Sequence, residues 1–208
     1  MNTYQKRILF RIISLLGLGF VGLTALVLFF PLSNIDRQFS EEVQEHHNHA
    51  LDALMEGISW FGYMPTSLII VLLVAAIFFL FKLRREALFL VITLGSGIVS
   101  SVIKILVNRP RPTENLVRIV EKARHQSFPS GHTLFYVVFF GFLTLLMVHL
   151  KHLPKALRFG VSTFCLFLIF AVPLARIYLG AHWFTDVLGG FLLGLIYLFI
   201  LGFYYLKS

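Results

Sequence analysis

The chain has 208 residues, of which 58% are hydrophobic and only 13% are charged, and its mean hydropathy is +0.84. This composition excludes an ordinary soluble domain and is typical of an integral membrane protein.

The formal net charge is +8. The basic residues lie in short segments between apolar runs, without a basic stripe interleaved with aromatic residues, so we expect no nucleic-acid partner. The single cysteine, Cys165, excludes an internal disulfide and is expected to be a buried, inert thiol.

The first apolar run covers residues 12–30 and follows the basic residues Lys6, Arg7 and Arg11. It is longer than the apolar region of a secretory signal, and no small-residue cleavage pattern follows it before Pro31. We therefore predict a retained transmembrane helix rather than a cleaved signal peptide.

Six apolar segments have roughly the 20 residues that a helix needs to cross ~30 Å of hydrocarbon. They cover about 9–30, 65–82, 86–107, 130–150, 156–177 and 184–206. The sequence therefore predicts an all-α integral membrane bundle of six transmembrane helices, which forms a single domain over residues 1–208.

Between the first and second spans, residues 36–62 carry apolar side chains at helical spacing with acidic residues between them. This pattern predicts an amphipathic helix that lies on the outer membrane interface. His46, His47 and His49 lie in this segment, but their spacing does not place all three on one helical face. We therefore predict a solvated polar face rather than a metal site.

The basic residues between the spans also predict the orientation of the chain. With a cytoplasmic N-terminus, the inner segments hold more Lys and Arg than the outer ones, and the bias is clear once Lys104, Arg111 and Arg176 are assigned to a site. We therefore expect the N-terminus in the cytoplasm, with the loops at 107–130 and 177–184 together on the extracytoplasmic side.

Three basic residues lie at the ends of apolar spans, where ionisable groups are rare unless they have a function. Lys104 is near the end of the third span, Arg111 follows it, and Arg176 closes the fifth. The two prolines that flank Arg111 cannot continue a helix, so we expect the chain to turn at about Asn108 and to bring Lys104 and Arg111 to one pocket. Arginine suits bidentate contact with phosphate, and lysine supplies a point charge.

The segment Pro129-Ser130-Gly131-His132 opens the fourth span. Ser130 is expected to cap a helix whose first N–H groups form an anion site, and Gly131 would let an oxyanion approach the backbone. A plain helix cap would explain the first three residues, but it would not explain His132.

His182 and Asp186 are four residues apart at the start of the sixth span, so we expect them on one helical face. A carboxylate that holds one imidazole nitrogen leaves the other nitrogen free to attack, as in catalytic triads. A purely structural His–Asp pair would have the same spacing, but the matching groups upstream favour catalysis.

At these residues the chain resembles the type 2 phosphatidic acid phosphatase superfamily of membrane lipid phosphatases. The family motif K-x6-R-P matches Lys104 with Arg111-Pro112, P-S-G-H matches residues 129–132, and S-R-x5-H-x3-D matches Arg176, His182 and Asp186. One departure is Ala175, which stands where the family has serine. The resemblance implies that His182 attacks phosphorus to form a phosphohistidine, that Asp186 orients it, and that His132 protonates the leaving group. It also implies a set of phosphate ligands: Lys104, Arg111, Ser130, Gly131 and Arg176.

We expect no metal or other cofactor, because the acids near the site, Asp186, Glu114 and Glu121, are too few and too scattered for a two-metal cage. The expected partners are the bilayer and a lipid phosphate, with the oligomeric state left open. Candidate substrates are undecaprenyl diphosphate, phosphatidylglycerophosphate, phosphatidic acid and lipid A phosphates. An outward-facing site favours undecaprenyl diphosphate.

Two other functions fit part of the pattern. Vanadium haloperoxidases share these motifs, but they are soluble, which the six apolar spans contradict. A lipid transporter or scaffold would carry its polar residues at mid-membrane, whereas the ionisable groups of this chain cluster at one interface.

Overall fold

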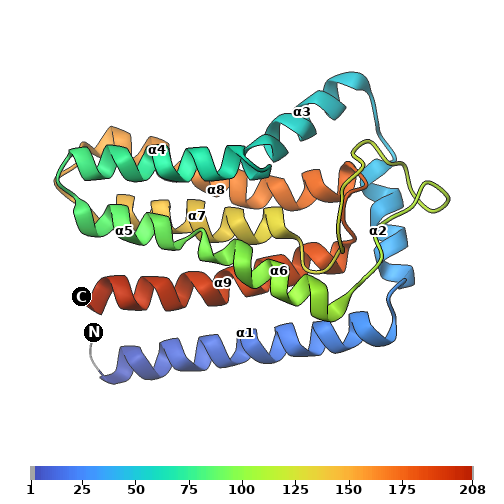
Figure 1. Ribbon diagram of the computed structural model, residues 1–208, viewed down its shortest axis with the longest axis horizontal. Coiled ribbons are helices and arrows are strands. Elements are labelled where there is room, and N and C mark those ends of the chain that lie inside the picture. Colours follow the sequence, from blue (N-terminus) through green and yellow to red (C-terminus); the bar gives the residue numbers. More distant parts are fainter. Residues whose placement is uncertain (1–2, 208) are drawn as a thin grey trace.

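The computed structural model describes residues 3–207, and all regular structure within that range is helical (Figure 1). The elements are α1 (Thr3–Phe29), α2 (Asn34–Gln44), α3 (His49–Ser59), the 3-10 turn η1 (Trp60–Gly62), α4 (Thr66–Leu80), α5 (Arg84–Ile92), α6 (Gly95–Val107), α7 (Gly131–His149), α8 (Lys155–Tyr178) and α9 (Phe184–Lys207). The predicted all-α class is confirmed.

Five stretches of the described chain are long and apolar enough to cross a membrane: Lys6–Phe29, Arg84–Val107, Gly131–His149, Lys155–Tyr178 and Phe184–Lys207. They agree with five of the six predicted spans, so the chain is a multi-pass membrane protein. The remaining predicted span, 65–82, corresponds to α4, which has 15 residues. The α4 helix follows His49–Gly62 at a bend of 58°, and this bent pair is a sixth span only if the two helices are counted together.

The predicted span 86–107 is divided into α5 and α6 at Thr93. The Thr93 hydroxyl and N–H both donate to the carbonyl of Leu90, at 2.5 and 3.1 Å, which tightens the last turn of α5. A Cβ atom at the next glycine, Gly95, would lie 2.5 Å from the Tyr197 hydroxyl of α9. Glycine and serine residues at this break allow the helix to bend and to approach α9 closely.

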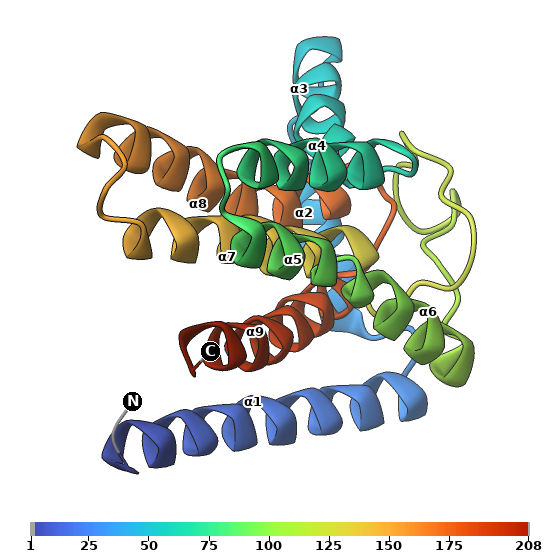
Figure 2. The same cartoon turned by 60° about the vertical axis from the view of Figure 1, so that its left-hand side comes forward.

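The α7 helix lies at the centre of the bundle, between α8 and α9, and α1 lies outside α9 (Figure 2). Two glycines of α9 make this packing possible. A Cβ atom at Gly194 would lie 2.7 Å from the Cβ atom of Val137, and a Cβ atom at Gly190 would lie 2.5 Å from the carbonyl oxygen of Ser130. The start of α7 is therefore held directly against the first turns of α9.

The structure corrects the prediction of one amphipathic helix over residues 36–62, because it contains two helices. The chain leaves α2 after Gln44, and Asn48 caps α3 by accepting the Leu51 N–H at 2.9 Å. The buried residues of α2 are polar: Asp36, Ser40 and Gln44. The spacing of apolar residues therefore did not indicate that polar side chains of α2 are buried. His46, His47 and His49 are exposed, and no cluster of metal-ligating side chains occurs among residues 3–207.

The long segment between α6 and α7 is held in place by α2 and α3. Gln44 donates to the carbonyls of Arg118 and Tyr178, both at 2.8 Å, and accepts the Arg118 N–H at 3.0 Å. Arg118 also pairs with Asp52 of α3 at 2.6 Å. This segment, α2 and the turn before α9 lie at one end of the bundle, and the ends of α1 and α9 that are nearest the chain termini lie at the other (Figure 1).

Candidate active site

The residues that the sequence predicted for the site all lie at the end of the bundle that contains the segment between α6 and α7. Lys104 is in the last turn of α6, which ends where Asn108 adopts a left-handed conformation with φ of 47° and donates its N–H to the Lys104 carbonyl. Ser130 caps α7, as predicted. Arg176 is in the last turn of α8 and Asp186 is in the first turn of α9. The predicted turn at Asn108 is therefore confirmed.

His182 precedes α9, which begins at Phe184, so the expectation of a shared helical face with Asp186 is corrected. The two side chains still meet, because His182 Nδ1 lies 3.5 Å from Asp186 Oδ2. On the other side of the ring, His182 Nε2 lies 3.3 Å from Arg111 Nη1. Arginine is only a donor, so this contact requires a lone pair on Nε2 and places the proton of the neutral ring on Nδ1.

The imidazole of His182 is 2% exposed. Burial and the nearby positive charges of Arg111, Lys104 and Arg176 hold the pKa of His182 well below its usual range. The ring is therefore neutral at neutral pH, and the protonation state of Nε2 is the one that a nucleophile needs.

The three predicted phosphate-binding cations are all held by neighbouring groups. Lys104 Nζ donates to the carbonyls of Gln126 and Ser127, at 2.7 and 3.1 Å. Arg111 donates to backbone carbonyls of three residues: His125, Arg124 and Ala181. Arg176 instead forms a pair with a carboxylate, that of Glu121. The cations are thus oriented by the backbone of the 108–130 segment, by the Ala181 carbonyl before α9 and by one acid, Glu121.

The first turn of α7 adds Ser130, Gly131 and His132 to this site. Ser130 Oγ accepts the Thr133 hydroxyl at 3.0 Å and the Thr133 N–H at 3.4 Å. A Cβ atom at Gly131 would lie 4.0 Å from Lys104 Cε, which places this turn beside the lysine. The His132 ring contacts the edge of the Tyr63 ring, with 4.9 Å between their centroids.

Three buried nitrogen atoms of this site have no hydrogen-bond partner among residues 3–207: His132 Nε2, His182 Nδ1 and Arg176 Nε. Buried polar atoms are normally paired, so each such exception needs an explanation. A phosphate group with its several acceptor oxygens would supply partners for His132 Nε2 and Arg176 Nε, whereas His182 Nδ1 faces Asp186 Oδ2 at 3.5 Å. The arrangement can therefore bind a phosphate ester with cations and present a neutral imidazole to it.

Sequence reasoning missed Arg109, although it lies within the first motif. Its guanidinium is fully buried and donates to Asp186 Oδ1 at 2.6 Å, to Thr185 Oγ1 at 2.7 Å and to Asp36 Oδ2 at 2.6 Å. Asp186 also accepts the Trp183 N–H at 2.8 Å. The repeated Arg-Pro pair, Arg109-Pro110-Arg111-Pro112, was the only available signal, and it did not indicate which arginine faces which partner.

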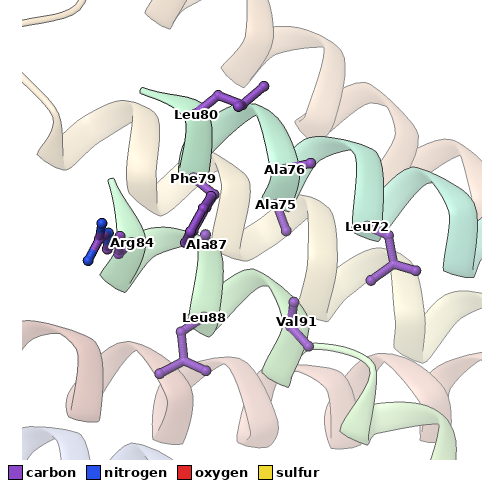
Figure 3. Close-up of a pocket in the computed structure, with 9 residues that line it drawn as sticks. All are labelled: Leu72, Ala75, Ala76, Phe79, Leu80, Arg84, Ala87, Leu88 and Val91. Carbon is purple, nitrogen blue, oxygen red and sulfur yellow. The ribbon is translucent and has the colours of Figure 1, made fainter. Parts of the chain in front are cut away.

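Two hollows on the described surface differ in their relation to the site. One, of about 430 Å³, borders the site at Arg111, the one predicted site residue in its lining, and is also lined by Glu121 and the Gly180–Ala181 turn. The other, of about 570 Å³, lies between α4 and α5, is lined by apolar side chains and Arg84, and contains none of the predicted site residues (Figure 3). We therefore associate the first hollow, and not the larger one, with the chemistry.

A family model described as the PAP2 superfamily matches residues 85–207. The chain belongs to the PAP2 superfamily. Phosphatidylglycerophosphatase B of Bacillus subtilis (strain 168) is 29% identical over 153 residues, which are 72% of this chain and 73% of that protein. This PAP2 protein is accordingly a membrane phosphatase.

Two solved structures are similar to this one. The crystal structure of a transmembrane PAP2-type phosphatidylglycerolphosphate phosphatase from Bacillus subtilis has a TM-score of 0.80 at 27% identity, and the similarity covers 94% of this chain and 96% of that one. The crystal structure of Aquifex aeolicus LpxE has a TM-score of 0.65 at 21% identity and covers 85% and 97% of the two chains. At 21% identity, the likeness to LpxE shows the fold alone.

Proposed function

We propose that this PAP2 protein removes phosphate from a membrane lipid through a phosphohistidine formed on His182. The observation that carries the proposal is the placement of His182 Nε2, 3.3 Å from Arg111, on a ring whose other nitrogen lies 3.5 Å from Asp186. This geometry supports attack by Nε2 on phosphorus, while Asp186 stabilises the proton on Nδ1.

In the proposed first step, His182 Nε2 forms a bond to phosphorus as the bond from phosphorus to the leaving oxygen breaks. His132 in its protonated form donates the proton that this oxygen takes up and is left neutral. In the second step water attacks the phosphohistidine, His132 accepts a proton from the water, and His182 and inorganic phosphate are released. Lys104, Arg111 and Arg176 balance the charge on the phosphoryl oxygens, and Ser130 with the Gly131 backbone contributes hydrogen bonds.

The proposed reaction uses no metal ion. The two acids at the site are each engaged by an arginine: Asp186 by Arg109 and Glu121 by Arg176. These carboxylates therefore contribute little to a cage for a divalent cation, and the cationic side chains supply the positive charge instead.

Among the candidate lipids, phosphatidylglycerophosphate is supported by the name of the curated Bacillus subtilis relative and by the description of the Bacillus subtilis crystal structure, and it is our first choice. Undecaprenyl diphosphate comes next, because the loop charges favour a cytoplasmic N-terminus and a site on the extracytoplasmic face. Phosphatidic acid is the third candidate. One catalytic domain over residues 1–208 is sufficient for the proposed reaction.

The test is phosphate release by the purified protein from a panel of these lipids, with and without EDTA. We expect release in both conditions. With ³²P-labelled lipid, rapid acid-free quenching should trap label on the wild-type protein and none on His182→Asn. Lipid flipping in liposomes without phosphate release would instead support the transporter alternative, and full activity of His182→Asn would exclude the proposed nucleophile.

A further inference from the structure

Glu121 holds the guanidinium of Arg176 in a two-point contact. Arg176 Nη1 donates to Glu121 Oε2 at 2.6 Å, and Nη2 donates to Oε1 at 2.9 Å. The Tyr63 hydroxyl donates to the same Oε2 at 2.5 Å. Arg176 is 1% exposed and the Glu121 side chain is 20% exposed. The acid is thus the outer member of a pair whose arginine is deeply buried.

This contact uses Nη1 and Nη2 of Arg176, two donors that a phosphate can also bind, and it leaves Nε of the same guanidinium without a partner among residues 3–207. Arginine binds carboxylate and phosphate with the same parallel pair of N–H donors. Lys104 and Arg111 are held by neutral backbone carbonyls, whereas Arg176 is held by a full negative charge. Glu121 therefore resembles an internal anion that occupies one corner of the phosphate site.

We propose that Glu121 is the resting ligand of Arg176 and that the phosphate group of the substrate takes its place. The proposal rests on the proposed function, specifically on Arg176 as a phosphate ligand. In the empty site the carboxylate keeps a buried arginine paired, which avoids the cost of an isolated buried charge. On binding, the phosphate oxygens accept the two N–H groups and the carboxylate turns away.

The surroundings of Glu121 allow this exchange without movement of the loop. Its backbone N–H donates to the Leu179 carbonyl at 3.1 Å, which anchors the main chain. The side chain borders the hollow of about 430 Å³ beside Arg111, so rotation about its own bonds brings the carboxylate toward water. Burial raises the pKa of this carboxyl group, but the hydrogen bond and charge of Arg176 lower it further, so the net pKa lies below the usual value. The displaced group is therefore a carboxylate that water can solvate.

The exchange predicts an unusual effect on ligand binding, because the carboxylate competes with the anion. Glu121→Gln keeps the size and one acceptor but removes the charge, so it should lower the Kd for orthovanadate at least tenfold in isothermal titration of the detergent-solubilised protein. Glu41→Gln is the control, since Glu41 is an exposed acid of α2 that pairs with Arg37 and does not line this hollow. We expect that variant to change the Kd less than twofold.

A purely structural Glu121–Arg176 pair predicts the opposite result, namely an unchanged or higher Kd in Glu121→Gln. If Arg176→Gln weakens vanadate binding while Glu121→Gln does not tighten it, the exchange is wrong and Arg176 remains a phosphate ligand. If Arg176→Gln binds vanadate like the wild type, Arg176 is not a phosphate ligand. The proposed displacement of Glu121 by phosphate is then wrong as well.

The proposal can also be tested if Glu121→Gln does not fold. Tyr63→Phe removes one donor to the carboxylate and should lower the Kd severalfold. A structure of the wild-type protein with orthovanadate should show oxygen atoms of the anion on Nη1 and Nη2 of Arg176, with Glu121 turned toward the hollow. Both nitrogens still bound to Glu121 with vanadate in the site would overturn the exchange.

Discussion

Arg109 Nη1 lies 2.6 Å from Asp186 Oδ1, and both side chains are completely buried. The same guanidinium lies 2.6 Å from Asp36, so it joins α2 to the first turn of α9. The carboxylate that faces His182 is therefore positioned by a residue outside the three predicted roles of nucleophile, acid and phosphate ligand. This relationship leads to the first prediction.

Arg109→Gln should leave Asp36 and Asp186 without their charged partner and should lower the free energy of unfolding by about 3–5 kcal/mol, the usual effect of breaking a buried pair. The fraction that folds should show a lower kcat with little change in KM, because Asp186 no longer holds the His182 ring. Thermal unfolding in detergent and steady-state kinetics measure the two effects.

Arg37→Gln, which removes an exposed pair with Glu41 on α2, is the control and should change stability by less than ~1 kcal/mol. Equal effects of both variants would contradict the prediction.

The contact between α7 and α9 predicts that Gly190 cannot be replaced. A Cβ atom there would lie 2.5 Å from the Ser130 carbonyl, which is main chain and cannot rotate away. Gly190→Ala should therefore cost about 1–3 kcal/mol of stability and should also lower activity, because it displaces the turn that carries His132. Gly22→Ala is the control, since no atom lies within 4 Å of its added Cβ atom, and it should be neutral or slightly stabilising. A fully stable and active Gly190→Ala protein would show that this close packing is not required.

His132→Ala should lose activity in a way that depends on the leaving group. With a lipid substrate, whose leaving oxygen must be protonated, we expect turnover to fall by about a hundredfold or more. With an aryl phosphate, whose leaving group departs as an anion, the loss should be much smaller. The measurement is the loss of turnover in His132→Ala with each of the two substrates. His152→Ala is the control, because this histidine is exposed and lies beyond the other end of α7, and it should leave both rates unchanged. An equal loss with both substrates would assign His132 to phosphate binding instead of proton transfer.

The low pKa of His182 predicts that its ring stays neutral in mildly acidic solution. An unperturbed histidine takes up a proton near pH ~6.5, and burial and the adjacent cations move His182 below that value. As the pH falls, His182 therefore becomes protonated in the unfolded chain before it does in the folded protein. The stability that depends on neutral His182 is thus present above pH ~6.5 and decreases as the pH falls below that value. NMR of protein labelled with ¹³C-histidine, assigned with His182→Asn, measures the titration. A midpoint at or above pH ~6.5 in the free enzyme would contradict the prediction.

The proposed orientation predicts which cysteine substitutions can be labelled from outside the cell. In a Cys165→Ser background, Asn115→Cys should react with a membrane-impermeant thiol reagent in intact cells. Lys151→Cys, in the exposed turn between α7 and α8, should react only after the membrane is opened. The reverse pattern would place the site in the cytoplasm and would favour a lipid that is dephosphorylated on the inner leaflet.

The sequence by itself determined the helical membrane class, most of the spans and the residues that meet at one end of the bundle. Long apolar runs specify spanning helices because backbone groups in lipid must be satisfied within the segment. The turn at Asn108 and the cap at Ser130 followed from local preferences of proline and serine, and the structure confirms both.

Only the tertiary structure decided which groups hold these residues in place. Arg109 lies 73 positions from Asp36 and 77 from Asp186, and Glu121 lies 55 from Arg176. Periodicity describes one element at a time, so it gave no sign that Asp36 and Gln44 of α2 are buried, because their partners, Arg109 and Arg118, come from distant segments. A buried charge is stable only beside its partner, and the position of that partner depends on how the helices pack.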